Sequence, residues 1–166
     1  GLAERGEEGA GYALQRAENH LVKNAVFNRE EFKDGKTVLQ RLRDLNVTHI
    51  VLAGFLWLVP EYLLKSYPDR IINIHPALLP NYGGKGMYGS KVHEAVKASG
   101  DLETGITIHI VNGRYDEGRI LFQAKCPVSE SHSADEIAAC VHQLEYKHYP
   151  KVIEKWILGS MEPTSP

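Results

Sequence analysis

The chain has 166 residues, of which 43% are hydrophobic and 24% are charged, and its formal net charge is −2. This length and composition predict one globular domain with a substantial core. No run of lysine or arginine indicates a nucleic-acid surface, and no apolar stretch approaches the length of a membrane span. We therefore expect neither nucleic acid nor membrane as a partner.

The spacing of cysteine and histidine gives no sign of a metal site or a disulfide framework. Cys126 and Cys140 stand alone, and no two of the eight histidines are four residues apart with a glutamate between them. We expect no metal, reduced thiols and a cytoplasmic location. The composition indicates nothing about the oligomeric state.

The first third of the chain is predicted to alternate helices and strands. Residues 1–11, rich in glycine and glutamate, are read as an unassigned lead-in to a domain over residues 12–158, which a tail over 159–166 follows. Asn28 is expected to cap a helical turn with Glu31 reaching back to it. Apolar spacing predicts helices over 12–21 and 36–46 and strands over 22–27 and 48–53.

The most informative stretch follows, at Ile71–His75. It is apolar and β-branched except for Asn73 and His75, and Pro76 ends any strand there because proline has no N–H to donate. A period of two places Asn73 and His75 on the same face, at the carboxyl end of a strand, where open α/β sheets place their ligands. The alternative is an ordinary buried pair whose polar groups are satisfied by the backbone.

The second half of the chain predicts a helix, a hairpin and a long final helix. The expected helices cover residues 90–99 and 133–149, with Pro150 interrupting or kinking the second before it continues over 151–158. A capping box of Ser133 and Glu136 is expected to begin the second helix. The expected strands cover 104–112 and 120–128, with Ile106, Ile108 and Ile110 on one face of the first. Residues 113–118 form a turn that carries Asp116. The whole pattern predicts an α/β domain with a Rossmann-like, mixed but mostly parallel sheet flanked by helices.

The apolar segment Phe55–Val59 after the predicted strand has two readings: it is either core packing or a wall for a flat aromatic ligand. Taken alone, Arg29 is read as an ordinary exposed arginine and Glu145 as a solvated charge on the last helix.

One family matches the central stretch. Asn73-Ile-His-Pro-Ala-Leu-Leu-Pro80, together with Asp116 in Tyr-Asp-Glu-Gly, resembles the folate-dependent formyltransferases. The resemblance extends from about residue 12 to 158, and the continuation Asn81–Gly89 is similar to the branch of the family that formylates glycinamide ribonucleotide. It implies the formyltransferase fold, 10-formyltetrahydrofolate as co-substrate and a role in purine biosynthesis.

The resemblance also implies roles for individual residues. Formyl transfer needs donors for a developing oxyanion and a group that moves a proton. Asn73 is expected to donate to the formyl oxygen, His75 to stabilise the oxyanion and shuttle the proton, and Asp116 to orient His75 or a relay water. No metal is required.

Binding residues follow from the same resemblance. The folate is expected to contact Arg29, Asn73 and the segment Leu56, Trp57, Leu58 and Val59, and Glu145 is expected to meet the ribose hydroxyls of the substrate. Trp57 departs from the residue types usual in the family.

One departure from the family concerns the start of the chain. The family begins with a strand and a glycine-rich loop that binds the substrate phosphate at a helix N-terminus. We expect no counterpart of either in residues 1–11, and therefore poor formyl transfer. The alternatives are a formyltetrahydrofolate hydrolase with the same residues and a non-catalytic folate-binding fragment.

Overall fold

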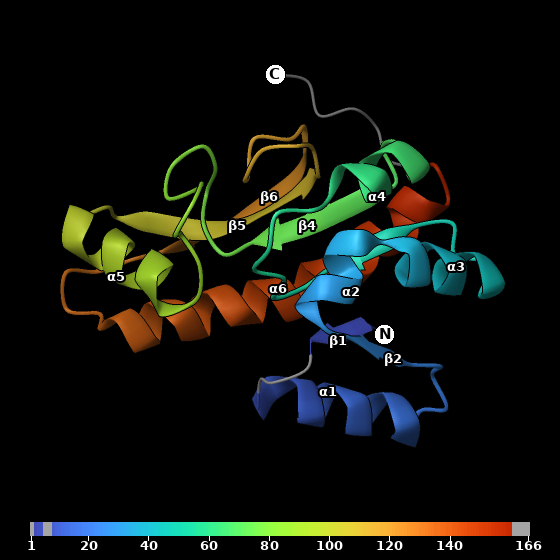
Figure 1. The fold of residues 1–166 in the computed structure, drawn as a ribbon. Coiled ribbons are helices and arrows are strands. Elements are labelled where there is room, and N and C mark those ends of the chain that lie inside the picture. The colour runs from blue at the N-terminus through green and yellow to red at the C-terminus, as the bar shows by residue number, and fades with distance from the viewer. Residues whose placement is uncertain (1, 5–7, 161–166) are drawn as a thin grey trace. The chain divides into compact units, whose positions relative to one another are not determined.

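A computed structural model describes residues 2–4 and 8–160 of the chain, with side chains from residue 14 onward (Figure 1). The chain divides into two compact units, Gly1–Val47 and Thr48–Pro166. The elements in the described residues are β1 (Leu2–Glu4), α1 (Glu8–Asn19), β2 (Ala25–Phe27), α2 (Arg29–Asp34), α3 (Lys36–Asp44), β3 (Ile50–Leu52), α4 (Glu61–Ser66), β4 (Ile71–His75), α5 (Ser90–Ser99), β5 (Glu103–Ile110), β6 (Ile120–Pro127) and α6 (Ala134–Ile157).

The first unit begins with a strand where the sequence predicted none. β1 and β2 pair in parallel, with Leu2 opposite Ala25, and α1 lies between them in the chain. The expectation that residues 1–11 lack a strand is therefore wrong. The sequence shows no sign of this strand, because three residues are too few to show a period of two and because the strand forms by pairing with a partner 23 positions away. The connection Arg5-Gly6-Glu7 lies outside the described residues, so the expected lack of a phosphate loop there stays a prediction.

The helices of the first unit form for local reasons. The capping box before α2 is confirmed: the Asn28 side chain accepts from the Glu31 N–H at 2.9 Å, and the Glu31 carboxylate accepts from the Asn28 N–H at 2.8 Å. In α3, Val38 and Leu42 are buried, which confirms the predicted apolar stripe.

The second unit contains a four-stranded sheet in the order β3-β4-β5-β6. β3 and β4 are parallel, whereas β4–β5 and β5–β6 are antiparallel. The α/β class with a mixed sheet flanked by helices is thereby confirmed. The expectation of a mostly parallel sheet is not met, since two of the three pairings in this sheet are antiparallel.

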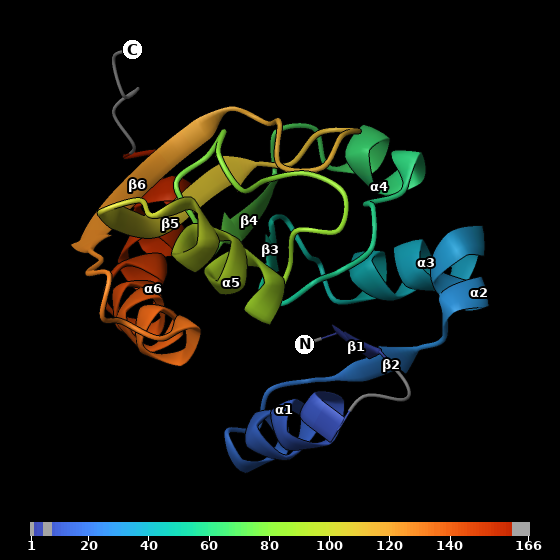
Figure 2. The same cartoon turned by 90° about the vertical axis from the view of Figure 1, so that its left-hand side faces the viewer.

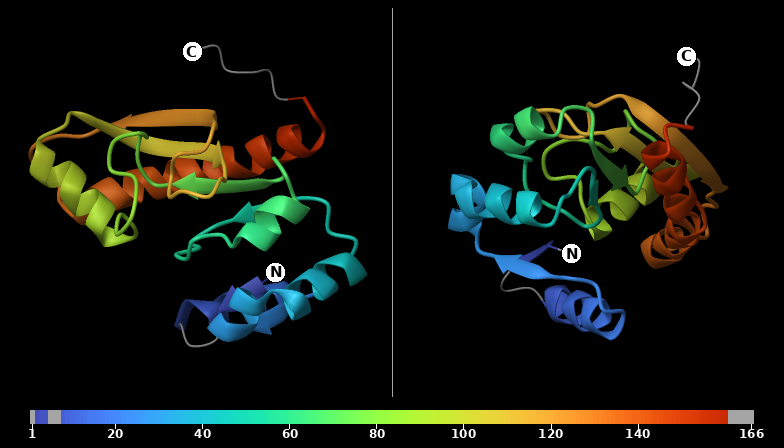
Figure 3. Two further views of the ribbon diagram at one scale, coloured as in Figure 1. Left: turned by 45° about the horizontal axis from the view of Figure 1, so that its top comes forward. Right: turned by 90° about the vertical axis from the view of Figure 1, so that its right-hand side faces the viewer.

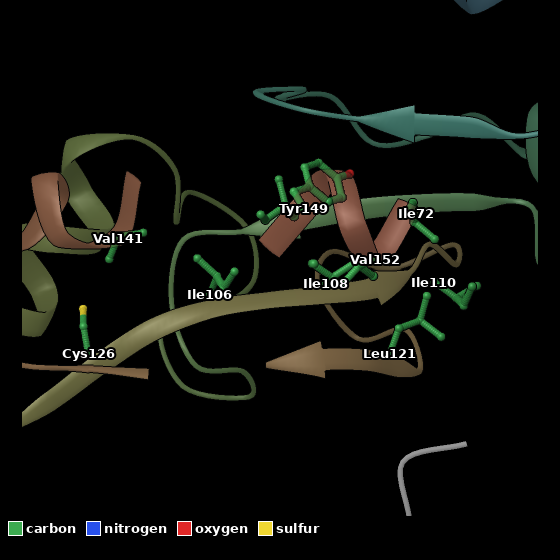
Figure 4. Close-up of a cluster of buried hydrophobic side chains, with 10 residues drawn as sticks. Ile72, Ile106, Ile108, Ile110, Leu121, Cys126, Val141, Tyr149 and Val152 are labelled. Atoms are coloured by element: carbon green, nitrogen blue, oxygen red, sulfur yellow. The ribbon is translucent and has the colours of Figure 1, made fainter. Parts of the chain in front are cut away.

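The last helix, α6, covers one face of this sheet. It runs along β5 and β6, and α5 packs beside it (Figures 1 and 2). The helix continues through Pro150, so the interruption considered from the sequence does not occur. Figure 4 shows the apolar side chains of the sheet beneath α6, with Val141, Tyr149 and Val152 of the helix among them.

The sheet has an apolar face and a face with polar groups, as the period of two requires. Ile106, Ile108 and Ile110 of β5 are all buried in the core cluster, which confirms their predicted common side. Their neighbours Thr107 and His109 are buried too, although they carry polar atoms.

The hairpin of β5 and β6 brings its turn back beside the carboxyl end of β4 (Figure 3, left). This turn carries Asp116, which has left-handed backbone geometry with φ 57°. The hairpin therefore brings Asp116 close to His75, which lies more than 40 positions earlier in the sequence.

The described part of the chain contains neither a membrane-spanning helix nor a cluster of metal ligands. Within residues 2–4 and 8–160, no helix is long and apolar enough to cross a membrane. The same residues contain no group of three or more histidine, cysteine, aspartate or glutamate side chains that could hold a metal ion.

Candidate active site

Asn73 and His75 lie at the carboxyl end of β4, as the sequence predicted. β4 is an inner strand, and its neighbours fix the register: Asn73 lies opposite Leu52 of β3 and His109 of β5. His75 is buried and Asn73 is half-buried. The strand therefore holds an amide and an imidazole side by side next to the loop that begins at Pro76.

Asp116 meets His75 from the hairpin turn. Its Oδ2 lies 3.5 Å from His75 Nδ1, and the same oxygen accepts a hydrogen bond from the Gly84 N–H at 3.0 Å. The carboxylate is only 12% exposed. The three predicted catalytic residues thus come together from two distant segments of the chain.

His109 is a fourth member of this cluster, and the sequence analysis did not include it. Its Nε2 lies 3.5 Å from Asp116 Oδ1 and 3.5 Å from Asn73 Nδ2, and its Nδ1 lies 3.1 Å from the Ile110 carbonyl oxygen. Asp116 therefore lies between two imidazoles. The available signal was the alternation of β5, which puts His109 on the face opposite the isoleucines. Only the strand register, however, places it across from Asn73.

The surroundings of His75 favour its neutral form. Burial is the largest influence and lowers the pKa of His75, and the nearby His109 acts in the same direction. The Asp116 charge and the hydrogen bond to the Tyr82 carbonyl act against burial, but the pKa still lies below the ordinary value for histidine. A neutral imidazole can accept a proton during a reaction.

Asp116 is held ionised in spite of its burial. Burial alone would raise the pKa of Asp116, but the hydrogen bond with His109, the electrostatic interaction with His75 and the hydrogen bond from the Gly84 N–H together lower it. The site therefore contains a fixed negative charge beside a neutral imidazole.

Asn73, His75 and Asp116 line a cavity of about 720 Å³ in the second unit. Four other segments complete its wall: the loop after β3, the glycine-rich loop 84–89, His93 of α5, and α6 from His142 to Pro150. This size falls within the range of about 300–1,000 Å³ that is usual for pockets that bind small molecules.

The predicted aromatic wall is only partly at this cavity. Phe55 and Leu56 line it, but Trp57, Leu58 and Val59 are not among the lining residues. Val59 is buried in the core, Leu58 is exposed, and the Trp57 ring packs edge-on against Phe55 with centroids 6.0 Å apart. The apolar segment thus combines core packing with cavity wall.

The two remaining predicted binding residues lie in different units. Glu145 on α6 lines the cavity and is half-buried, and burial raises the pKa of its carboxyl group. Arg29 is the first residue of α2 in the first unit. Its proposed contact with folate stays a prediction.

The cavity suits a ligand with a flat apolar part and a reacting carbonyl group. An amide N–H₂ and an imidazole can donate to a developing oxyanion, and the carboxylate stabilises a protonated imidazole.

The sequence matches the formyl transferase family over residues 6–153, and the chain belongs to this family. Two curated relatives are phosphoribosylglycinamide formyltransferases. The chain is 49% identical over 112 residues to the chloroplastic phosphoribosylglycinamide formyltransferase of Arabidopsis thaliana, a match that covers 68% of this chain and 38% of the relative. It is 38% identical over 149 residues to the phosphoribosylglycinamide formyltransferase of Haemophilus influenzae, a match that covers 87% of this chain and 68% of the relative.

A solved structure agrees with the sequence relatives. The glycinamide ribonucleotide transformylase 1 of Symbiobacterium toebii superposes with a TM-score of 0.81 at 28% identity, covering 95% of this chain and 74% of that one. The resemblance to the family is thus confirmed. The chain spans 38% of the length of the two chloroplastic relatives it matches.

Proposed function

We propose that this chain transfers a formyl group from 10-formyltetrahydrofolate to the amine of glycinamide ribonucleotide, a reaction of purine biosynthesis. The observation that carries this proposal is the meeting of Asn73, His75 and Asp116 at one end of a cavity of about 720 Å³. The names of the relatives support the same substrates.

The surroundings of each of the three residues support a role in the reaction. Asn73 is half-buried at the cavity, so its amide can donate to the formyl oxygen as negative charge develops there. His75 is neutral before reaction, so it can take the proton that the attacking amine loses. Asp116 is ionised, so it stabilises the imidazolium that results and keeps the ring oriented.

The folate supplies the one-carbon unit, and the protein supplies binding and orientation. We place the folate against Leu56, which lines the cavity beside Phe55. Glu145 is placed at the ribose hydroxyls of the ribonucleotide, because its half-buried carboxyl group lines the same cavity. No step requires a metal ion.

The location of the protein is part of the proposal. We place it in the cytoplasm, although two relatives are named as chloroplastic. Fractionation of the source cells, with detection of the intact chain in each compartment, tests this placement.

The reaction is tested by following release of tetrahydrofolate with and without glycinamide ribonucleotide. Transfer predicts that release requires the amine and equals the formylated product formed. Release at the same rate without the amine, with formate as the product, would identify a hydrolase instead. Folate binding by calorimetry without either product would identify a non-catalytic binding protein.

A further inference from the structure

Both ring nitrogens of His75 have fixed neighbours. Nε2 lies 2.7 Å from the backbone carbonyl oxygen of Tyr82, and Nδ1 lies 3.5 Å from Asp116 Oδ2. A carbonyl oxygen only accepts hydrogen bonds, so a contact of this length requires a hydrogen on Nε2. In the neutral imidazole, Nδ1 is then the nitrogen without a hydrogen.

We infer that Tyr82 is a positioning residue, whose carbonyl fixes the Nε2–H tautomer of His75 and so makes Nδ1 the atom that accepts and returns the proton. The partner of one ring nitrogen sets the state of the other, which is how histidines in enzyme sites are commonly oriented. The catalytic part of this inference rests on the proposed function. The tautomer itself does not.

The side chain of Tyr82 anchors the carbonyl that His75 uses. Its hydroxyl donates toward Ser99 Oγ at 2.6 Å and also contacts the Asp101 carboxylate. Its ring packs against a buried cluster made of Val96, Val128 and Ile137. The residue is thus held at both ends of its side chain, near the end of α5.

The backbone of Tyr82 needs such an anchor. Its φ is 55°, in the left-handed region that residues other than glycine rarely adopt, and tyrosine gains no local hydrogen bond there as asparagine or aspartate would. The conformation therefore depends on the surrounding contacts. The hydroxyl contacts with Ser99 and Asp101 are the ones that a single substitution can remove without changing the ring.

With Nδ1 as the atom that accepts and returns the proton, the bonds and protons of the transfer balance as follows. The amine lone pair forms the new bond to the formyl carbon, and the electron pair of the bond from that carbon to folate N10 goes to N10. The proton lost by the amine moves to Nδ1 and then to N10. While Nδ1 carries it, the imidazolium hydrogen faces the Asp116 carboxylate, which lowers the energy of that state.

The tautomer is measured directly by long-range nitrogen–proton NMR of the ¹⁵N-labelled chain, at a pH of about 8, where His75 is neutral. We expect the Nε2–H form in the parent. Tyr82→Phe removes the anchoring hydroxyl and should produce a mixture of tautomers. It should also lower the pH at which His75 titrates, because the hydrogen bond to Tyr82 raises the pKa of His75. The other titratable groups near His75 are Asp116, His109 and His93, and the substitution leaves all three in place.

Matched variants separate positioning from a general loss of structure. Tyr62→Phe on α4 removes another tyrosine hydroxyl from the same unit and should leave the His75 spectrum unchanged. Asp101→Ala should repeat the effect of Tyr82→Phe in a chain that keeps the tyrosine, whereas Asp101→Asn keeps an acceptor oxygen and should restore the parent spectrum. Thermal unfolding of each variant verifies that it is folded.

The kinetic readout is kcat for formyl transfer, which we expect Tyr82→Phe to lower about tenfold while KM for the folate stays within about twofold. An Nδ1–H tautomer in the parent would overturn the inference, and so would a His75 spectrum and titration that Tyr82→Phe and Asp101→Ala leave unchanged. If the spectra behave as expected but the parent transfers no formyl group, the proposed function fails while the tautomer assignment stands.

Discussion

Asp116 is the residue on which the electrostatics of the site depend. Its two oxygens face two different imidazoles, those of His75 and His109, each at 3.5 Å. It reaches this place on the turn between β5 and β6, with left-handed backbone geometry. A single carboxylate thereby contacts a histidine at the end of β4 and a histidine near the end of β5.

Replacing His75 with alanine should lower the rate of transfer by about 10²–10³, because the group that carries the proton from the amine to N10 is lost. The fold should remain, since the core of the second unit lies on the other face of the sheet. Single-turnover rates and thermal unfolding measure the two effects. His20→Ala, at an exposed position, serves as the control, and a His75→Ala chain with nearly normal turnover would remove this residue from the mechanism.

The pH dependence follows from the lowered pKa of His75. Activity that needs the neutral imidazole should hold down to a pH below the ordinary histidine value of about 6.5 and fall as His75 becomes protonated. The folded state favours neutral His75, so neutral His75 contributes to the free energy of unfolding. This contribution is complete above the ordinary histidine pKa of about 6.5 and is lost as the pH falls through the lowered pKa of His75. Asp116→Asn removes a charge that raises the pKa of His75, so the acidic fall in kcat should move to still lower pH.

A pH–rate profile of the Asp116→Asn variant tests whether the acidic fall in kcat moves to lower pH. Its maximum rate should also fall, by about 10²–10³, because the imidazolium loses its ionised partner. An acidic fall that moves to higher pH would show that another group titrates in that range.

At the scale of single elements, the hairpin turn is placed by a close backbone approach at Gly118. A Cβ atom there would lie 1.6 Å from the Ile110 carbonyl oxygen, so no side chain fits without moving the turn. Asp116 lies two residues earlier in the same turn. A change in the packing at Gly118 is therefore expected to move the carboxylate of Asp116.

Gly118→Ala should destabilise the chain by about 1–3 kcal/mol, as overpacking usually does, and should lower the transfer rate by displacing Asp116. Gly113→Ala, in the same turn, is the matched control because no atom lies within 4 Å of its added Cβ. Urea unfolding and transfer rates of both variants measure the difference. Equal stability and activity for the two would refute this account of the turn.

The segment Phe55–Val59 gives an optical test of the cavity. Folate bound against Phe55 and Leu56 should change the fluorescence of Trp57, whose ring touches Phe55. Trp156 packs against His49 instead and should respond less. Titration of folate into Trp57→Phe and Trp156→Phe separates the two signals. A quench that survives in Trp57→Phe and disappears in Trp156→Phe would place the folate elsewhere.

At the scale of the whole molecule, the sequence predicted the α/β class, the order of the longer elements and three of the four clustered site residues. It succeeded where the signal is local: the capping boxes at Asn28 and Ser133, the alternation of β5, and the pair Asn73 and His75 two positions apart. It failed at β1, a three-residue strand defined only by its partner. It also missed His109, whose place depends on antiparallel register rather than on spacing along the chain.

Family membership and the cavity suggest one activity for the molecule, and the fate of the formyl carbon tests it most directly. A ¹³C label in the formyl group of 10-formyltetrahydrofolate is followed by NMR through a single turnover with glycinamide ribonucleotide, in the parent and in Asn73→Ala. We predict that the parent moves the label into the amide of the formylated ribonucleotide, and that Asn73→Ala does so about 10²–10³ more slowly, because one oxyanion donor is lost. Label that reaches only formate, or that reaches the ribonucleotide equally fast in both chains, would contradict the account.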